Sequence, residues 1–202
     1  MSTTTDVALL LFEGRRIPRA LGDCSAVTVS EPVDVDTAFT ARRLVVVGSD
    51  ADLATVLGRL LKADRLDIEV AVLGPFRSAR RARTGQAQRV PLIRDETGTV
   101  LVGAAYWLPP DESARQIEGE AVVDDTVLFD GAATAVRIEP TTGQPGLRAS
   151  VLSPRMRARR WVAGRAVQLG TTGALVVRDG VQVPRTIRRS TFYRHTQGWL
   201  RV

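Results

Sequence analysis

The sequence is poor in the residues that metal and covalent chemistry most often require. Its 202 residues include one cysteine (Cys24), one histidine (His195) and one lysine (Lys62). A single cysteine cannot form an internal disulfide, and this set cannot build a Cys/His zinc site or a two-histidine protease helix. Lys62 follows no glycine-rich phosphate loop, so a Walker-type nucleotide site is excluded and Schiff-base chemistry is disfavoured.

Long hydrophobic runs are also missing. The longest, Val7 to Phe12 and Leu44 to Val47, are far shorter than the roughly 20 residues that a membrane-spanning helix needs. The N-terminus lacks the basic segment and apolar core of a signal peptide. We therefore expect no transmembrane segment and a cytoplasmic location.

The basic residues are almost all arginine. Lys62 is the only lysine among 28 basic residues, and the net charge is +6. Two explanations stay open: a high-GC coding genome with an actinobacterial type of composition, or a surface enriched in arginine to bind anions.

Residues 1–85 have the pattern of a small α/β domain. Expected strands are Val7 to Phe12, Ala26 to Ser30, Leu44 to Val47 and Ile68 to Leu73. Between the last two, apolar residues at helical spacing predict a helix from Asp52 to Ala63. This order is a strand–helix–parallel strand unit, and a further helix is expected over Arg77 to Thr84.

Residues 86–202 change to short alternating strands separated by turn dipeptides, which predicts an all-β domain built as an antiparallel sandwich or barrel. The expected strands are Val90 to Ile93, Thr99 to Tyr106, Gly119 to Val123, Val127 to Phe129, Ala132 to Ile138, Arg148 to Leu152, Ala166 to Leu169, Ala174 to Arg178 and Val181 to Pro184. Turns are expected at Asp130-Gly131, Thr142-Gly143 and Asp179-Gly180.

The turn from Gly48 to Asp52 is the first candidate site. It follows a strand and precedes a helix, and ligands of open α/β sheets bind at the carboxyl ends of strands. Because successive turns of parallel strands open on one edge, the start of the Arg77 helix should lie beside it. The predicted nucleotide or phosphate site therefore comprises Gly48, Ser49, Asp50, Arg77, Ser78 and Arg80. The simpler alternative is a tight turn with Ser49 or Asp50 as helix cap, and a solvated arginine face.

The order of these motifs resembles the diacylglycerol kinase catalytic family, lipid kinases related to NAD kinases. The family turn Gly-Gly-Asp-Gly-Thr is here Gly48-Ser49-Asp50-Ala51-Asp52. The family element Pro-x-Gly-Thr-x-Asn-Asp-Phe is here Pro75 to Ala82, and Asp-Gly-Glu is here Asp179-Gly180-Val181. The resemblance implies a two-part fold. It implies ATP and Mg²⁺ as cofactors, and Asp179 as the candidate catalytic residue, only if the protein is an active kinase; otherwise the sequence leaves the cofactor unknown.

Three departures from the family pattern argue against catalysis. Ala51 adds a Cβ where the backbone would approach phosphate, and Asp52 puts a carboxylate beside the phosphate oxygens. Val181 removes the proton acceptor that the family glutamate supplies. We expect a catalytically impaired lipid-kinase-like protein, a pseudoenzyme that binds a nucleotide, a lipid phosphate or a protein partner. The alternative is an active, divergent lipid kinase; no metal site is expected from the residues themselves.

Two arginine-rich segments predict an anionic partner surface. They mix arginine with aromatic residues, which suits phosphate contacts on an anionic membrane, and less favourably a nucleic acid. The residues concerned are Arg157, Arg159, Arg160, Arg188, Arg189 and Arg194. A third function class, an arginine-rich nucleic-acid-binding module, therefore stays open.

Overall fold

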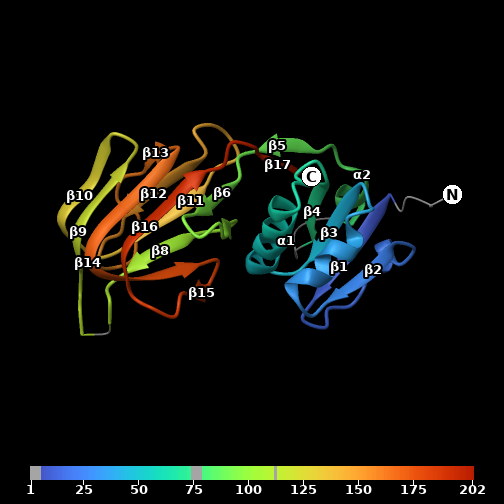
Figure 1. The fold of residues 1–202 in the computed structure, drawn as a ribbon, viewed down its shortest axis with the longest axis horizontal. Helices are drawn as coiled ribbons and strands as arrows, with labels where there is room; N and C mark the ends of the chain where they lie inside the picture. The colour runs from blue at the N-terminus through green and yellow to red at the C-terminus, as the bar shows by residue number, and fades with distance from the viewer. Residues whose placement is uncertain (1–5, 74–78, 112) are drawn as a thin grey trace. The chain divides into compact units, whose positions relative to one another are not determined.

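The computed structural model describes residues 6–73, 79–111 and 113–202, and the chain divides into two compact units (Figure 1). The first unit runs to Val90 and also contains the C-terminal segment Gln197–Val202. The second unit runs from Pro91 to Thr196. The sequence-based division after residue 85 differs from this, because it assigned the C-terminal segment to the all-β part.

The first unit is built on a six-stranded sheet in the order β2-β1-β3-β4-β17-β5. Its strands are β1 (Val7–Phe12), β2 (Ser25–Val29), β3 (Arg43–Val47), β4 (Glu69–Leu73), β5 (Gln88–Val90) and β17 (Trp199–Arg201). All neighbours are parallel except β17 and β5. Every residue of β1 and β3 is buried, as expected where both faces of a parallel sheet are covered.

The helices of this unit are α1 (Asp50–Lys62), α2 (Ala79–Thr84) and the 3-10 helices η1 (Arg19–Leu21) and η2 (Pro32–Ala38). Helix α1 connects parallel strands β3 and β4, which confirms the predicted strand–helix–strand unit. Its buried face consists of Leu53, Val56, Leu57 and Leu60. Of the helix predicted over Arg77 to Thr84, the part from Ala79 onward is described.

A buried arginine ties this unit together. Arg43, at the start of β3, is 3% exposed, and its Nε donates to Glu69 on β4 at 2.7 Å. Its terminal nitrogens donate to the carbonyl oxygens of Ala82 at 3.1 Å, Arg83 at 2.6 Å and Gly85 at 2.8 Å. These carbonyls lie at the end of α2, where a helix leaves its acceptors unpaired. Arg43 therefore joins two strands to the end of a helix.

The second unit is a large antiparallel sheet of eleven strands. Its main order is β13-β12-β11-β8-β14-β16-β6-β7, with β9 pairing β14 and β10, and β15 pairing β14. The bounds are β6 (Ile93–Asp95), β7 (Val100–Leu101), β8 (Ala105–Leu108), β9 (Ile117–Val123), β10 (Thr126–Ala133), β11 (Val136–Pro140), β12 (Leu147–Val151), β13 (Val162–Gly164), β14 (Ala166–Arg178), β15 (Val181–Gln182) and β16 (Ile187–Arg194). The predicted all-β architecture is confirmed.

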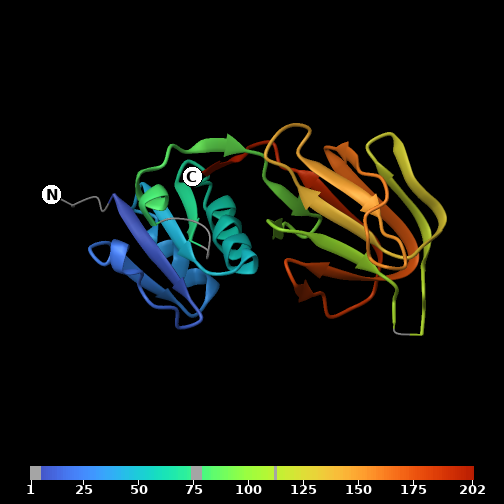
Figure 2. The ribbon, with the colours of Figure 1, turned by 180° about the vertical axis from the view of Figure 1, so that it is seen from behind.

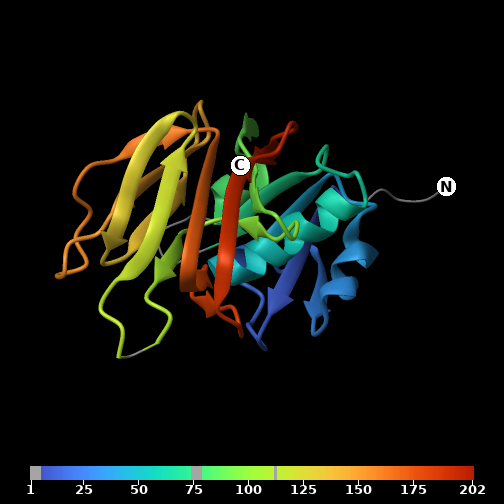
Figure 3. The same cartoon turned by 60° about the vertical axis from the view of Figure 1, so that its left-hand side comes forward.

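Strand β14 connects several parts of this sheet through its pairings. Figures 2 and 3 show it running beside β16. Its first half pairs with β9 and its second half with β8, so one strand serves two parts of the sheet. A register shift against β16 falls between Gly170 and Ala174. The core below contains Trp107 and Phe192, whose ring centroids are 6.2 Å apart, and the Trp107 indole N–H donates to Ser190 Oγ at 3.1 Å.

Several sequence-based element boundaries were wrong. The predicted strand Val90 to Ile93 is divided between β5 and β6, because Pro91 cannot donate a ladder hydrogen bond. The predicted strand Thr99 to Tyr106 is divided between β7 and β8, and the two strands predicted on either side of Gly170 form the single strand β14. The predicted turn Asp130-Gly131 lies inside β10.

No helix among the residues described is long and apolar enough to cross a membrane.

Candidate functional site

The Gly48 turn ends in a side-chain cap on helix α1. Ser49 is the N-cap, and its Oγ accepts a hydrogen bond from the Asp52 amide at 3.3 Å. In return, Asp52 Oδ2 accepts from the Ser49 amide at 2.7 Å and from Ser49 Oγ–H at 2.8 Å. This is a capping box, in which two free amides of the helix terminus are satisfied by the chain itself.

The cap places a carboxylate where a phosphate would bind. Helix N-termini attract anions through their free amides and positive dipole end, and Asp52 already occupies that position. A Cβ on Gly48 would lie 2.6 Å from Asp52 Oδ2, so the glycine leaves room for this carboxylate. Asp50 is exposed in the first turn of the same helix and adds a second negative charge. Two carboxylates in the first turn make the helix terminus less favourable for a phosphate.

The next turn along the sheet opens on the same edge. Val47 at the end of β3 pairs with Leu73 at the end of β4, so the segments following both strands leave from neighbouring positions. Arg77 and Ser78 lie outside the described residues. Arg80 is exposed on α2. Convergence of the six predicted phosphate-site residues stays a prediction.

Asp179 lies in a tight hairpin between β14 and β15. Asp179 and Gly180 both have positive φ, +47° and +83°, as expected for a two-residue hairpin turn. Both carboxylate oxygens of Asp179 accept bonds from backbone amides, from Val102 at 3.0 Å, Gly103 at 2.7 Å and Ala104 at 3.1 Å. The side chain thus fastens the hairpin to the β7–β8 loop.

The residues that flank the Asp179-Gly180 turn, Arg178 and Val181, differ in their environments. Arg178 forms an ion pair with Asp95, which is 4% exposed and also accepts from the amide and hydroxyl of Thr97. Burial lowers the pKa of the Arg178 guanidinium, and the neighbouring Asp179 charge opposes that shift. Val181, where the family pattern has glutamate, is 59% exposed. A valine side chain offers no proton acceptor.

The six arginines of the predicted anionic surface lie on separate parts of the second unit. Arg157, Arg159 and Arg160 are exposed after β12, whereas the other three are on β16. Strands β11, β8 and β14 separate β12 from β16 in the sheet order. Arg188 and Arg189 are successive strand residues and so point to opposite faces. Arg194 donates to the Pro145 carbonyl at 2.8 Å. One surface formed by all six stays a prediction.

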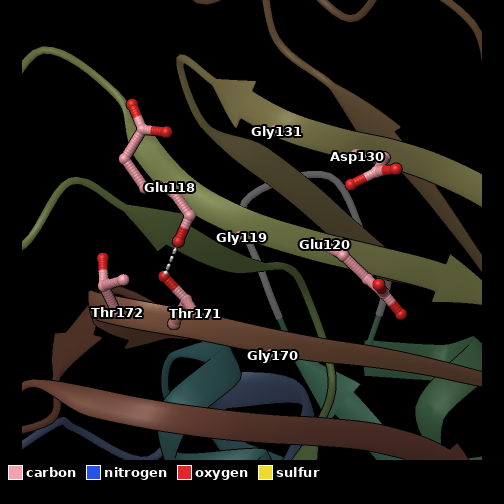
Figure 4. A pocket seen from close by; sticks show the side chains of 8 residues that line it. All are labelled: Glu118, Gly119, Glu120, Asp130, Gly131, Gly170, Thr171 and Thr172. Carbon is pink, nitrogen blue, oxygen red and sulfur yellow. Dashed lines mark hydrogen bonds between the residues drawn. The ribbon is translucent and has the colours of Figure 1, made fainter.

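Sequence reasoning did not identify an acidic hollow of about 510 Å³ on β9, β10 and β14 (Figure 4). Its carboxylates are Glu118 and Glu120, at alternate positions of β9, and Asp130, directly opposite Glu120 on β10. The Thr171 hydroxyl donates to the Glu118 carbonyl at 2.6 Å. Among the residues that the structure describes, no cluster of three or more acidic, histidine or cysteine side chains is arranged to hold a metal. The Glu-x-Glu alternation was the available sequence signal.

Replacing Asp52 with threonine is expected to raise affinity for ATP at least about tenfold. The substitution removes a negative charge from the helix N-terminus, and a like charge about 4 Å away costs several kcal/mol at a protein surface. Threonine also keeps a hydroxyl beside Ser49. Isothermal titration calorimetry with ATP would measure the change. Asp64→Asn, beyond the other end of α1, is the charge-matched control, because asparagine tolerates the φ of +53° at that position. Equal affinity of wild type and Asp52→Thr would contradict the interpretation.

Comparisons with known proteins agree with this arrangement at the level of fold. No protein-family model and no curated protein matches the sequence. A diacylglycerol kinase structure from Bacillus anthracis matches with a TM-score of 0.72 at 12% identity, covering 100% of this chain and 98% of that one. An NAD kinase from Archaeoglobus fulgidus, in complex with ATP, matches with a TM-score of 0.64 at 11% identity, covering 96% and 92%.

A third similar structure is yeast NADH kinase complexed with NADH. It has a TM-score of 0.61 at 7% identity, and the match covers 100% of this chain and 84% of that one. The chain therefore has the fold shared by diacylglycerol kinases and NAD kinases, and the resemblance inferred from motif order is confirmed at that level.

Proposed function

We propose that this protein keeps the lipid and NAD kinase fold without transferring phosphate, and that it acts by binding. The main support for the proposal is the environment of Asp179, the one catalytic candidate. Both of its carboxylate oxygens accept hydrogen bonds from the backbone amides of Val102 to Ala104. These bonds give the carboxylate a structural role, which competes with accepting a proton from a substrate hydroxyl.

The Gly48 turn supports the same proposal independently. A phosphate-binding turn presents free amides to the nucleotide, whereas here the amides of Ser49 and Asp52 are paired within the cap. The charge of Asp52 would also oppose the negative charge that phosphoryl transfer concentrates on the phosphate oxygens. In this proposal the Gly48 turn therefore contributes little to phosphate binding or to phosphoryl transfer.

The similar structures indicate which class of ligand to test first. The archaeal kinase is described with ATP and the yeast kinase with NADH, so a nucleotide is the first ligand to test. A lipid phosphate and a protein partner are the other two candidates. A regulatory protein of this kind would bind its ligand without consuming it.

Purified protein with ATP and Mg²⁺ is expected to phosphorylate neither diacylglycerol nor NAD above the protein-free rate. Loss of a general base alone commonly lowers the rate about 10²- to 10⁴-fold, and the capped turn should lower it further. Transfer of labelled phosphate from ATP to each acceptor would be measured, with a circular dichroism melt to show that the protein is folded. Turnover that disappears in the Asp50→Asn variant would refute the proposal and establish an active, divergent kinase.

A further inference from the structure

The loop after β12 is an ordered basic hairpin with an apolar tip. Leu152 and Ala158 form an antiparallel bridge at its base, and the Ser153 amide donates to the Arg157 carbonyl at 2.9 Å. At the tip, the Met156 amide donates to the Ser153 carbonyl at 2.8 Å, closing a turn. Pro154 occupies the second position of that turn, which its fixed φ favours. The backbone of the loop is therefore held in one shape.

This shape exposes an apolar side chain between cations. Met156 is 51% exposed and has a φ of +56°, a conformation that non-glycine residues rarely adopt. Arg155 and Arg157 flank it and are exposed, as are Arg159 and Arg160 just beyond. The guanidinium groups of these four arginines form no hydrogen bond or ion pair with other residues that the structure describes. Elsewhere arginines such as Arg148, which pairs with Glu139, have acidic partners.

A hollow beside the tip could receive an anionic group. It has a volume of about 420 Å³ and is lined by Ser153, Pro154, Arg155 and Arg157. Two arginines that line one small hollow suit a phosphodiester, because arginine binds phosphate oxygens through paired N–H donors.

We propose that this loop, Ser153 to Arg160, docks the protein on an anionic lipid bilayer, with Met156 entering the interface and the arginines contacting headgroup phosphates. An apolar tip flanked by basic residues combines the two contributions to interfacial membrane binding, burial of apolar area and attraction to anionic lipids. A nucleic acid fits less well, since bases need free aromatic faces and the nearest ring, Trp161, is stacked at 4.3 Å by the Arg148 guanidinium. The proposal does not depend on whether the protein transfers phosphate.

The test is co-sedimentation with vesicles of phosphatidylcholine alone and of equal parts phosphatidylcholine and phosphatidylglycerol. Wild type should bind the anionic vesicles, and Arg155→Gln with Arg157→Gln should lower the partition coefficient about 30-fold, since each basic residue at such a surface contributes about fivefold. Met156→Asn should lower it about tenfold by removing the apolar contact, and asparagine tolerates the positive φ. The matched control is Arg115→Gln with Arg185→Gln, which removes equal charge from exposed positions of the second unit outside the loop and outside the six arginines discussed above, and it should change binding by less than about threefold.

Quenching of tryptophan fluorescence would show whether the loop from Ser153 to Arg160 is the part that contacts the bilayer. Trp107 and Trp199 are buried, whereas Trp161 is partly exposed beside the loop, so brominated phosphatidylglycerol should quench Trp161. Trp161→Phe gives the background. Equal loss in the two arginine pairs, or bound protein without quenching, would overturn the proposal. Binding to single-stranded oligonucleotide that depends on Arg155 and Arg157, without vesicle binding, would overturn it in favour of a nucleic acid.

Discussion

Replacing Arg43 with methionine is expected to lower the free energy of unfolding of the first unit by about 3–5 kcal/mol. Methionine keeps much of the side-chain volume but leaves the carbonyls at the end of α2 without their donor. It also removes the buried charge that faces Glu69. Breaking a buried pair from one side costs much more than the pair contributes net, because the remaining polar groups stay desolvated.

The neighbouring arginine provides the control. Arg42 also pairs with Glu69, at 2.7 Å, but its side chain is 49% exposed, so Arg42→Met should cost less than about 1 kcal/mol. Native-state hydrogen exchange of peptides from β3 and α1 reports on this unit separately from the second. Equal and small effects for the two variants would show that the contacts of Arg43 at the end of α2 contribute little to stability.

The helix and strands of the first unit were predictable because their signals are local. The apolar residues of α1 recur at helical spacing, and β1 and β3 are continuous apolar runs bounded by polar turns. Strand β17 was not predictable in the same way. It has three residues and exists because β4 and β5 provide edges for it to pair with, a partnership that no pattern within Trp199–Arg201 encodes.

The second unit shows how tertiary packing overrides turn signals. Gly119 pairs with Gly131 on β10 and with Thr171 on β14, and a Cβ on Gly119 would lie 2.1 Å from the Gly170 carbonyl oxygen. The glycines therefore permit close approach of strands, as happens where a strand carries glycine in its interior. Taken alone, Asp130-Gly131 and Gly170 have the sequence signature of turns, which explains the misplaced boundaries.

In the candidate site, too, some features could be predicted from local sequence and others could not. A cap at Ser49 follows from local sequence, since serine before a helix and an acidic residue three positions later form a recognisable pair. The three amides that bind Asp179 come from a loop far earlier in the chain. Only the folded structure brings them together, so sequence reasoning could identify Asp179 as a candidate without knowing that its oxygens were engaged.

Asp179→Ala is therefore expected to destabilise the second unit by about 3 kcal/mol. The substitution leaves the amides of Val102, Gly103 and Ala104 without their charged acceptor. A hydrogen bond to a charged group contributes about 1.5–3 kcal/mol, but the three losses do not add in full because water can bind the amides that are left exposed. Alanine at a φ of +47° adds about 1 kcal/mol of backbone strain. Urea denaturation followed by hydrogen exchange of the β7–β8 loop would measure both the global and the local effect.

Two further variants separate these causes. Asp179→Asn tolerates positive φ and retains one acceptor oxygen, so it should lose roughly half as much stability as alanine. Asp130→Ala removes an exposed carboxylate of the same unit and should change stability by less than about 0.5 kcal/mol. If Asp179→Ala were as stable as wild type, its amide contacts would be dispensable, the carboxylate would be free to accept a proton, and the main argument against catalysis would fall. A large loss for alanine with an intermediate loss for asparagine is what a structural fastening predicts, because stability then follows the number of acceptor oxygens that remain.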